Sequence, residues 1–125
     1  MGVKVYTSYY ANPKLKSLPT YIKTVSVSNS TPAWFEPTFR LERLSPSWPL
    51  IEAYKQKHIS FELFREKYCE ELKTKFESTE EIRNLVFNRI GPDDVAVLLC
   101  WEKDESTCHR SILAEFFPDE YVGEL

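Results

Sequence analysis

Hydrophobic and polar residues alternate along two early segments of this chain, and a third segment is apolar throughout. Val3–Tyr9 and Tyr21–Ser28 alternate with the two-residue period of a β-strand that buries one face. Val95–Cys100 is continuously apolar, which is typical of a strand covered on both faces in a parallel sheet. The pattern therefore predicts three strands, with the third in the middle of the core.

Hydrophobic residues recur at helical spacing in four other segments. Ser60 and Ser78 precede two of these segments and are expected to cap the helices, because serine hydroxyls accept hydrogen bonds from free backbone N–H groups. Residues 29–49 contain four prolines, the last at the start of the first helix, so most of this region is expected to form an irregular loop. The spacing predicts helices over residues 49–57, 60–76, 78–90 and about 107–117.

Strands that alternate with helices in this way predict an α/β fold. We expect a small three-layer-like domain, with a mainly parallel central sheet flanked by helices. A length of 125 residues is near the commonest domain size, so residues 1–125 are expected to form a single domain. The hydrophobic fraction of 42% and the aromatic fraction of 14% exclude intrinsic disorder.

Several features of the sequence indicate a cytoplasmic protein. No apolar run approaches the ~20 residues that span a bilayer, so no membrane association is expected. The N-terminus begins with a strand-like pattern and lacks the layout of a signal peptide. Three cysteines, an odd number, suggest free thiols in a reducing compartment.

The net charge of −3 argues against a protein that binds nucleic acid through its overall electrostatic field. The charge is uneven, because residues 1–50 hold six Lys or Arg against two Glu. A mildly basic N-terminal half is compatible with an anionic ligand, although a solvated surface is the more common explanation. Charge alone therefore does not identify a partner.

Reactive and charged residues gather at the turn between the third predicted strand and the last helix. Because the carboxyl ends of parallel strands share one edge, side chains from the ends of the other two strands are expected to join them. The free N–H groups of the last helix and the guanidinium of Arg110 favour an anion. We therefore expect a phosphate-bearing ligand, such as a nucleotide or a nucleic-acid end. The expected ligand-binding residues are Tyr9, Tyr10, Ser28, Cys100, Trp101 and Arg110.

Two other hypotheses fit the same turn. In the first, the domain is an enzyme that uses Cys108 as a nucleophile, with His109 or Glu102 moving protons. In the second, Glu102 and Arg110 form a structural ion pair that binds no ligand. Cys100 and Cys108 are either two free thiols or a reversible disulfide, and the oligomeric state is not indicated.

The same residues also offer ligands for a metal. The order C-x-E-x5-C-H supplies two thiolates, a carboxylate and an imidazole, which is enough for a tetrahedral zinc site. The spacing differs from that of paired C-x-x-C zinc motifs, and the chain has no glycine-rich phosphate loop. We therefore expect neither a metal nor a cofactor.

The stretch L-L-C-W-E-K-D-x3-C-H-R-S-I-L-A-E over residues 98–115 resembles the signature of the domain of unknown function 488 family. The resemblance extends to residues 5–9, to L-S-P-S-W over residues 44–48 and to F-x2-F-R-E-K-Y-C-E-E-L over residues 61–72. It implies a compact α/β fold and supplies no activity. The shared polar residues that it implies are Cys100, Glu102, Cys108, His109 and Arg110.

Overall fold

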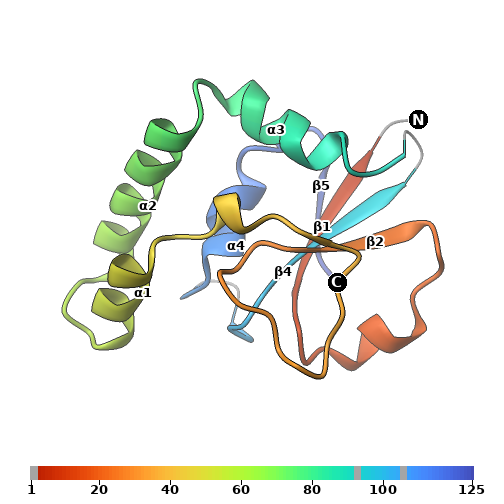
Figure 1. Ribbon diagram of the computed structural model, residues 1–125, viewed down its shortest axis with the longest axis horizontal. Coiled ribbons are helices and arrows are strands. Elements are labelled where there is room, and N and C mark those ends of the chain that lie inside the picture. The colour runs from red at the N-terminus through yellow and green to blue at the C-terminus, as the bar shows by residue number, and fades with distance from the viewer. Residues whose placement is uncertain (1–2, 92–93, 105–106) are drawn as a thin grey trace.

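A computed structural model of the chain describes residues 3–91, 94–104 and 107–125 (Figure 1). Five parallel strands form one sheet in the order β3-β2-β4-β1-β5. β4 lies at the centre of the sheet, and all six of its residues are buried. The strands are β1 (Lys4–Tyr9), β2 (Ile22–Ser26), β3 (Phe39–Arg40), β4 (Val95–Cys100) and β5 (Tyr121–Glu124).

Four α-helices accompany the sheet, as the hydrophobic spacing predicts. Ser60 and Ser78 cap two of them, because their hydroxyls accept hydrogen bonds from the backbone N–H groups of Leu63 and Glu81. No helix among the described residues is both long and apolar enough to cross a membrane. The helices are α1 (Trp48–Lys55), α2 (Phe61–Lys75), α3 (Thr79–Phe87) and α4 (His109–Ala114), together with the short 3-10 helices η1 (Pro13–Ser17) and η2 (Glu42–Leu44).

The predicted α/β class and parallel sheet are confirmed, whereas two strands and one helix boundary were missed. β3 and β5 are only two and four residues long, too short to show a clear two-residue alternation. The last helix begins at His109 rather than at Thr107, and Cys108, expected inside its first turn, is the residue that precedes it. Residues 105–106, immediately before the predicted start, lie outside the described part of the chain.

Both faces of the sheet are covered, but by different kinds of structure. Leu98 packs into the main core, to which all four α-helices contribute side chains. Val97 and Leu99 point to the opposite face and pack with Leu15 of η1 and Phe35 of the proline-rich loop. The central strand is therefore buried on both sides, as its continuous apolar run predicts, and its second cover is a loop and a 3-10 helix.

The parallel arrangement brings the carboxyl ends of the strands to one edge of the sheet. In the register, Tyr9 lies beside Cys100, and Ser26 beside Leu99. The hydroxyl of Tyr10 shares hydrogen bonds of 2.6 Å with the hydroxyls of both Ser26 and Ser28. The expected convergence of the three strand ends is confirmed, and this edge carries the candidate site.

Candidate functional site

A pocket of about 470 Å³ lies at the carboxyl edge of the sheet. One wall is helix α1, which contributes Trp48, Tyr54 and Lys55. Phe64 of α2, the segment after β2 and the turn from β4 to α4 complete the lining. Glu71 of α2 fixes the start of α1, because its carboxylate accepts hydrogen bonds from the backbone N–H (2.8 Å) and hydroxyl (2.5 Å) of Ser47. The pocket is thus built between elements that the core holds in place.

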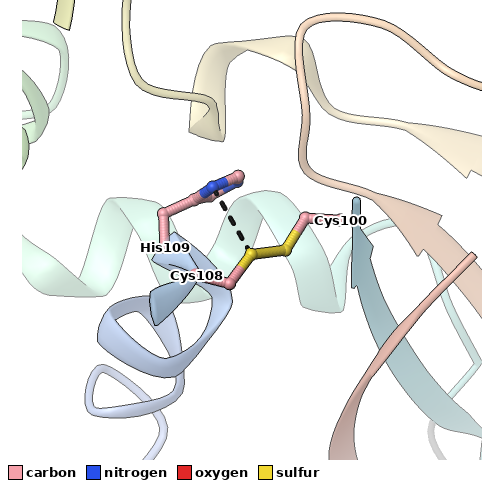
Figure 2. Close-up of side chains that lie close together, drawn as sticks. All are labelled: Cys100, Cys108 and His109. Atoms are coloured by element: carbon pink, nitrogen blue, oxygen red, sulfur yellow. Dashed lines mark hydrogen bonds between the residues drawn. A yellow bond between two sulfur atoms is a disulfide. The ribbon is translucent and has the colours of Figure 1, made fainter. Parts of the chain in front are cut away.

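Two cysteines meet in the lining of this pocket. Cys100 at the end of β4 and Cys108 before α4 are joined by a disulfide, and their Cα atoms are 7.3 Å apart (Figure 2). Their residues are only 1% and 3% exposed, while Cys69 on α2 is a free thiol. The structure thus pairs two of the three cysteines that the odd count had suggested to be free, and the pairing requires the turn to fold back on itself.

His109 is held beside the cysteine pair by its second ring nitrogen. Nε2 lies 2.7 Å from the carbonyl oxygen of Val27, which can only accept, so Nε2 carries the proton and donates it. Nδ1 therefore presents its lone pair, and it lies 4.0 Å from Sγ of Cys108 (Figure 2). Burial lowers the pKa of His109 to about 4, with a smaller contribution from the charge of Arg110. The imidazole is neutral at pH 7.

These three side chains form a compact set of metal-ligand atoms. The two sulfurs and an imidazole nitrogen all lie within 4.8 Å of one another, and all three residues are buried. The sequence spacing argued against a metal here, but the turn places the donors much closer than their separation along the chain suggests. The cluster can therefore hold a metal when the two thiols are reduced.

Arg110 is fully buried, and protein atoms take all of its N–H groups. Nε and Nη2 donate to the carboxylate of Glu124 at 2.9 and 3.0 Å. Nη1 donates to Sγ of Cys100 at 3.3 Å and to the carbonyl of Glu102, and Nη2 also donates to the carbonyl of Lys103 at 3.1 Å. The expected pairing with the Glu102 carboxylate is wrong. The five donors of a guanidinium are all engaged in this set of bonds.

Glu102 instead lies at the exposed side of the pocket, near Tyr54 of α1. Its side chain belongs to the lining, and the residue is exposed. Burial raises the pKa of Tyr54, and the charges of Glu102 and Asp104 raise it further. With Lys55 in the same wall, the mouth of the pocket carries both signs of charge.

The structure brings most of the predicted site residues together. Ser28, Cys100, Trp101, Glu102, Cys108 and His109 all line the pocket. Tyr10 lies below the rim, where its ring contacts Trp101 edge-on with centroids 5.4 Å apart. Tyr9 is not one of the described residues that line the pocket. Arg110 is fully buried behind the pocket lining.

Three structural features that build the site were not predicted from the sequence. The wall formed by α1 carries no polar motif that would have marked it. The carbonyl of Val27 is a backbone atom, and no residue type predicts its role. Glu124 follows Gly123, whose φ of +142° is accessible mainly to glycine. Because glycine has no side chain, it interrupts any alternating pattern in this short strand, so the sequence does not indicate the strand.

The comparisons with known proteins gave one match. The family model DUF488-N3a, described as the active DUF488-N3 subclade, matches residues 4–120. No curated protein and no solved structure matches the chain. The match confirms the resemblance that the cysteine, histidine and arginine motif indicates.

Replacing Glu124 by glutamine should destabilise the protein strongly. The change leaves the guanidinium of Arg110, which is 0% exposed, without its counter-charge. Because the Glu124 side chain is 25% exposed, we expect a loss of about 2–4 kcal/mol, somewhat below that of a fully buried pair. Urea unfolding monitored by circular dichroism measures it.

The matched control is Glu115→Gln, which removes the carboxylate of an exposed ion pair with Arg65. That change should cost no more than about 1 kcal/mol. Equal losses for the two variants would show that Arg110 does not depend on Glu124.

The buried His109 should make the protein less stable as the pH falls. The unfolded chain takes up a proton near pH 6.5, whereas the folded chain resists it until about pH 4, so stability is lost across that interval. Between pH 7 and pH 5 the wild-type protein should lose about 2 kcal/mol more than a His109→Gln variant.

Urea melts of the disulfide-bonded protein at each pH test this difference. His58→Gln serves as the control for the substitution, because His58 is exposed whereas His109 is buried. If His109→Gln kept the full pH dependence, another group would be its source.

Proposed function

Because the chain belongs to the DUF488-N3a family, the active DUF488-N3 subclade, we propose that it is a cysteine-dependent enzyme with Cys108 as its nucleophile. One observation supports this most strongly. The sulfur of Cys108 has the lone pair of His109 on one side and the sulfur of Cys100 on the other, in the lining of a pocket. A nucleophile, a base and a second thiol are thus within reach of one bound molecule.

In the reduced protein, the neutral imidazole of His109 faces the thiol of Cys108 with Nδ1 and accepts its proton as the sulfur attacks the substrate. The resulting thiolate is the reactive form of cysteine. The hydrogen bond from Nε2 to Val27 keeps the imidazole in the tautomer that this step requires. Tyr68 contacts the imidazole ring edge-on, with centroids 5.6 Å apart, and restricts its rotation.

The reaction class that uses both thiols is thiol–disulfide exchange. The Cys108 thiolate attacks one sulfur of a substrate disulfide, forms a mixed disulfide and expels the other half as a thiolate, which takes the proton from His109. Cys100 then attacks the sulfur of Cys108, releases the second half and transfers its own proton to it. The substrate gains two electrons and two protons, and the protein ends in the disulfide-bonded state. Two molecules of an external thiol then reduce the protein disulfide by the same exchange and leave joined as a disulfide.

Arg110 supports this cycle without touching the substrate. Its Nη1 donates to the sulfur of Cys100, and a hydrogen bond from a cation stabilises a thiolate relative to a thiol. Arg110 is therefore a positioning residue for the second thiol. Its buried bonds to Glu124 and to the turn keep that sulfur in place.

A phosphate-bearing ligand is the second candidate, and one observation favours it. The rings of Trp48 and Trp101 are 56% and 47% exposed, and both line the pocket together with Lys55. Indole rings stack on nucleobases, and a lysine ammonium attracts a phosphate. In this proposal Lys55 takes the role that the sequence had suggested for Arg110, whose donors are occupied. An anionic small molecule or a nucleic-acid end stays the expected partner.

Kinetic trapping with oxidised glutathione tests the proposed enzyme. The reduced wild-type protein should convert it to the thiol, and Cys108→Ser should abolish the reaction. In Cys100→Ser the second step is missing, so the glutathione adduct on Cys108 should accumulate and be visible by mass spectrometry. Cys69→Ser is the matched control and should react like the wild-type protein, because Cys69 lies on α2 outside the pocket lining.

Two results would contradict the proposal. One is a wild-type rate in Cys108→Ser. The other is a Cys100→Ser variant that consumes oxidised glutathione without forming the adduct. Serine differs from cysteine by a single atom, and thermal melting of each variant checks that it has folded.

A further inference from the structure

A metal site is the strongest feature of the molecule that the proposed exchange reaction does not require. We propose that the reduced protein binds one zinc ion through Cys100, Cys108 and Nδ1 of His109, with a fourth position open to the pocket. Two thiolates and one imidazole with an open position are a set that zinc accepts in catalytic sites. The inference stands on the arrangement of these atoms and does not rest on the proposed function.

Reduction of the disulfide frees three donor atoms that lie close enough to surround one small ion. Zinc bonds of about 2.3 Å to sulfur and about 2.0 Å to nitrogen place tetrahedral ligand atoms roughly 3.5–3.8 Å apart. Sγ of Cys108 is already 4.0 Å from Nδ1 of His109, and all three donors lie within 4.8 Å. In the disulfide-bonded protein the Cα atoms of Cys100 and Cys108 are 7.3 Å apart, and rotation of the two side chains after reduction would place both sulfurs on the ion.

The second ring nitrogen of His109 is arranged as in metal-binding histidines. Such histidines generally donate their other N–H to a carboxylate or a backbone carbonyl, which fixes the tautomer and orients the ring. Here Nε2 donates to the carbonyl of Val27 at 2.7 Å, and Nδ1 points toward the sulfurs (Figure 2). A histidine that served packing alone would not need its free lone pair directed at two cysteines.

The charged groups around the cluster are compatible with the binding of a divalent cation. Two thiolates neutralise the charge of Zn²⁺, and Glu124 neutralises the guanidinium of Arg110 behind them. The N–H that Arg110 directs at the sulfur of Cys100 can remain when that sulfur binds a metal, because such sulfurs accept hydrogen bonds from the protein. The buried cation therefore does not oppose metal binding.

Binding of the ion and formation of the disulfide exclude each other. When the two thiolates give two electrons to an oxidant such as a disulfide or a peroxide, their sulfurs join and the zinc ion is released. The open coordination position faces the pocket that Glu102 and Tyr54 line, so a water molecule or a polar group of a ligand can fill it. The site thus has a metal-bound reduced state and a metal-free oxidised state.

The test uses the full chain with zinc sulfate as the probe. Protein reduced and handled without oxygen is mixed with excess zinc and desalted, and the bound metal is measured by elemental analysis. We expect one zinc per reduced chain and well under one per oxidised chain. Cobalt substitution should give thiolate-to-cobalt charge-transfer bands only in the reduced protein.

Three variants locate the ion. Cys100→Ser and Cys108→Ser should each weaken zinc binding by at least ~100-fold, since loss of a ligand exceeds the effect of losing an outer partner. Cys69→Ser should bind like the wild-type protein. Zinc bound equally by oxidised protein, or unchanged in the two pocket variants, would overturn the proposal, as would a folded, reduced wild-type protein that retains no zinc.

These outcomes are separable from those of the exchange reaction. Cys100→Ser is expected to lose zinc and yet to form the adduct on Cys108, so one variant gives opposite results in the two assays. The comparison of reduced with oxidised wild-type protein needs no substitution, so it holds even for a variant that fails to fold.

Discussion

The buried guanidinium of Arg110 is the interaction on which the site depends. It connects α4 to the carboxylate of Glu124 on β5 and to two backbone carbonyls of the turn that follows β4. A charge with no solvent exposure tolerates few alternative arrangements, because each N–H that loses its partner is costly. The turn is therefore held back against the sheet, and this brings Cys108 to Cys100. Arg110 thus acts as the structural support of the site.

The parallel sheet supplies the second constraint. Because all five strands run in one direction, their carboxyl ends meet at one edge, and the segment after β2 reaches His109 through the carbonyl of Val27. The helix α1 closes the other side of the pocket. Residues that are far apart in the sequence thus share one small volume.

The sequence predicted the parts of this structure that rest on periodicity. The central strand, the three long helices and the shared edge of the strand ends all follow from the spacing of apolar residues and from the parallel sheet that it implies. Most residues of the motif around Cys100 and Cys108 line the pocket.

The remaining features depend on long-range contacts that no local pattern encodes. The partner of Arg110 could not be predicted, since β5 is four residues long and contains a glycine with positive φ. The orientation of His109 is set by a backbone atom 82 residues away. The wall formed by α1 carries no motif that marks it in the sequence as part of a site. The anion hypothesis assigned ligand binding to Arg110, because the sequence does not show that the N–H donors of its guanidinium are already occupied by protein atoms.

A crystal structure of the reduced protein tests the central claim most directly. The account predicts that Arg110 still holds Glu124 and the turn, and that both sulfurs and Nδ1 of His109 remain grouped at the pocket without the covalent bond. The hydrogen bond from Nε2 to Val27 should persist. A reduced structure in which Cys108 leaves the pocket, or in which His109 turns Nδ1 away from the sulfurs, would contradict it.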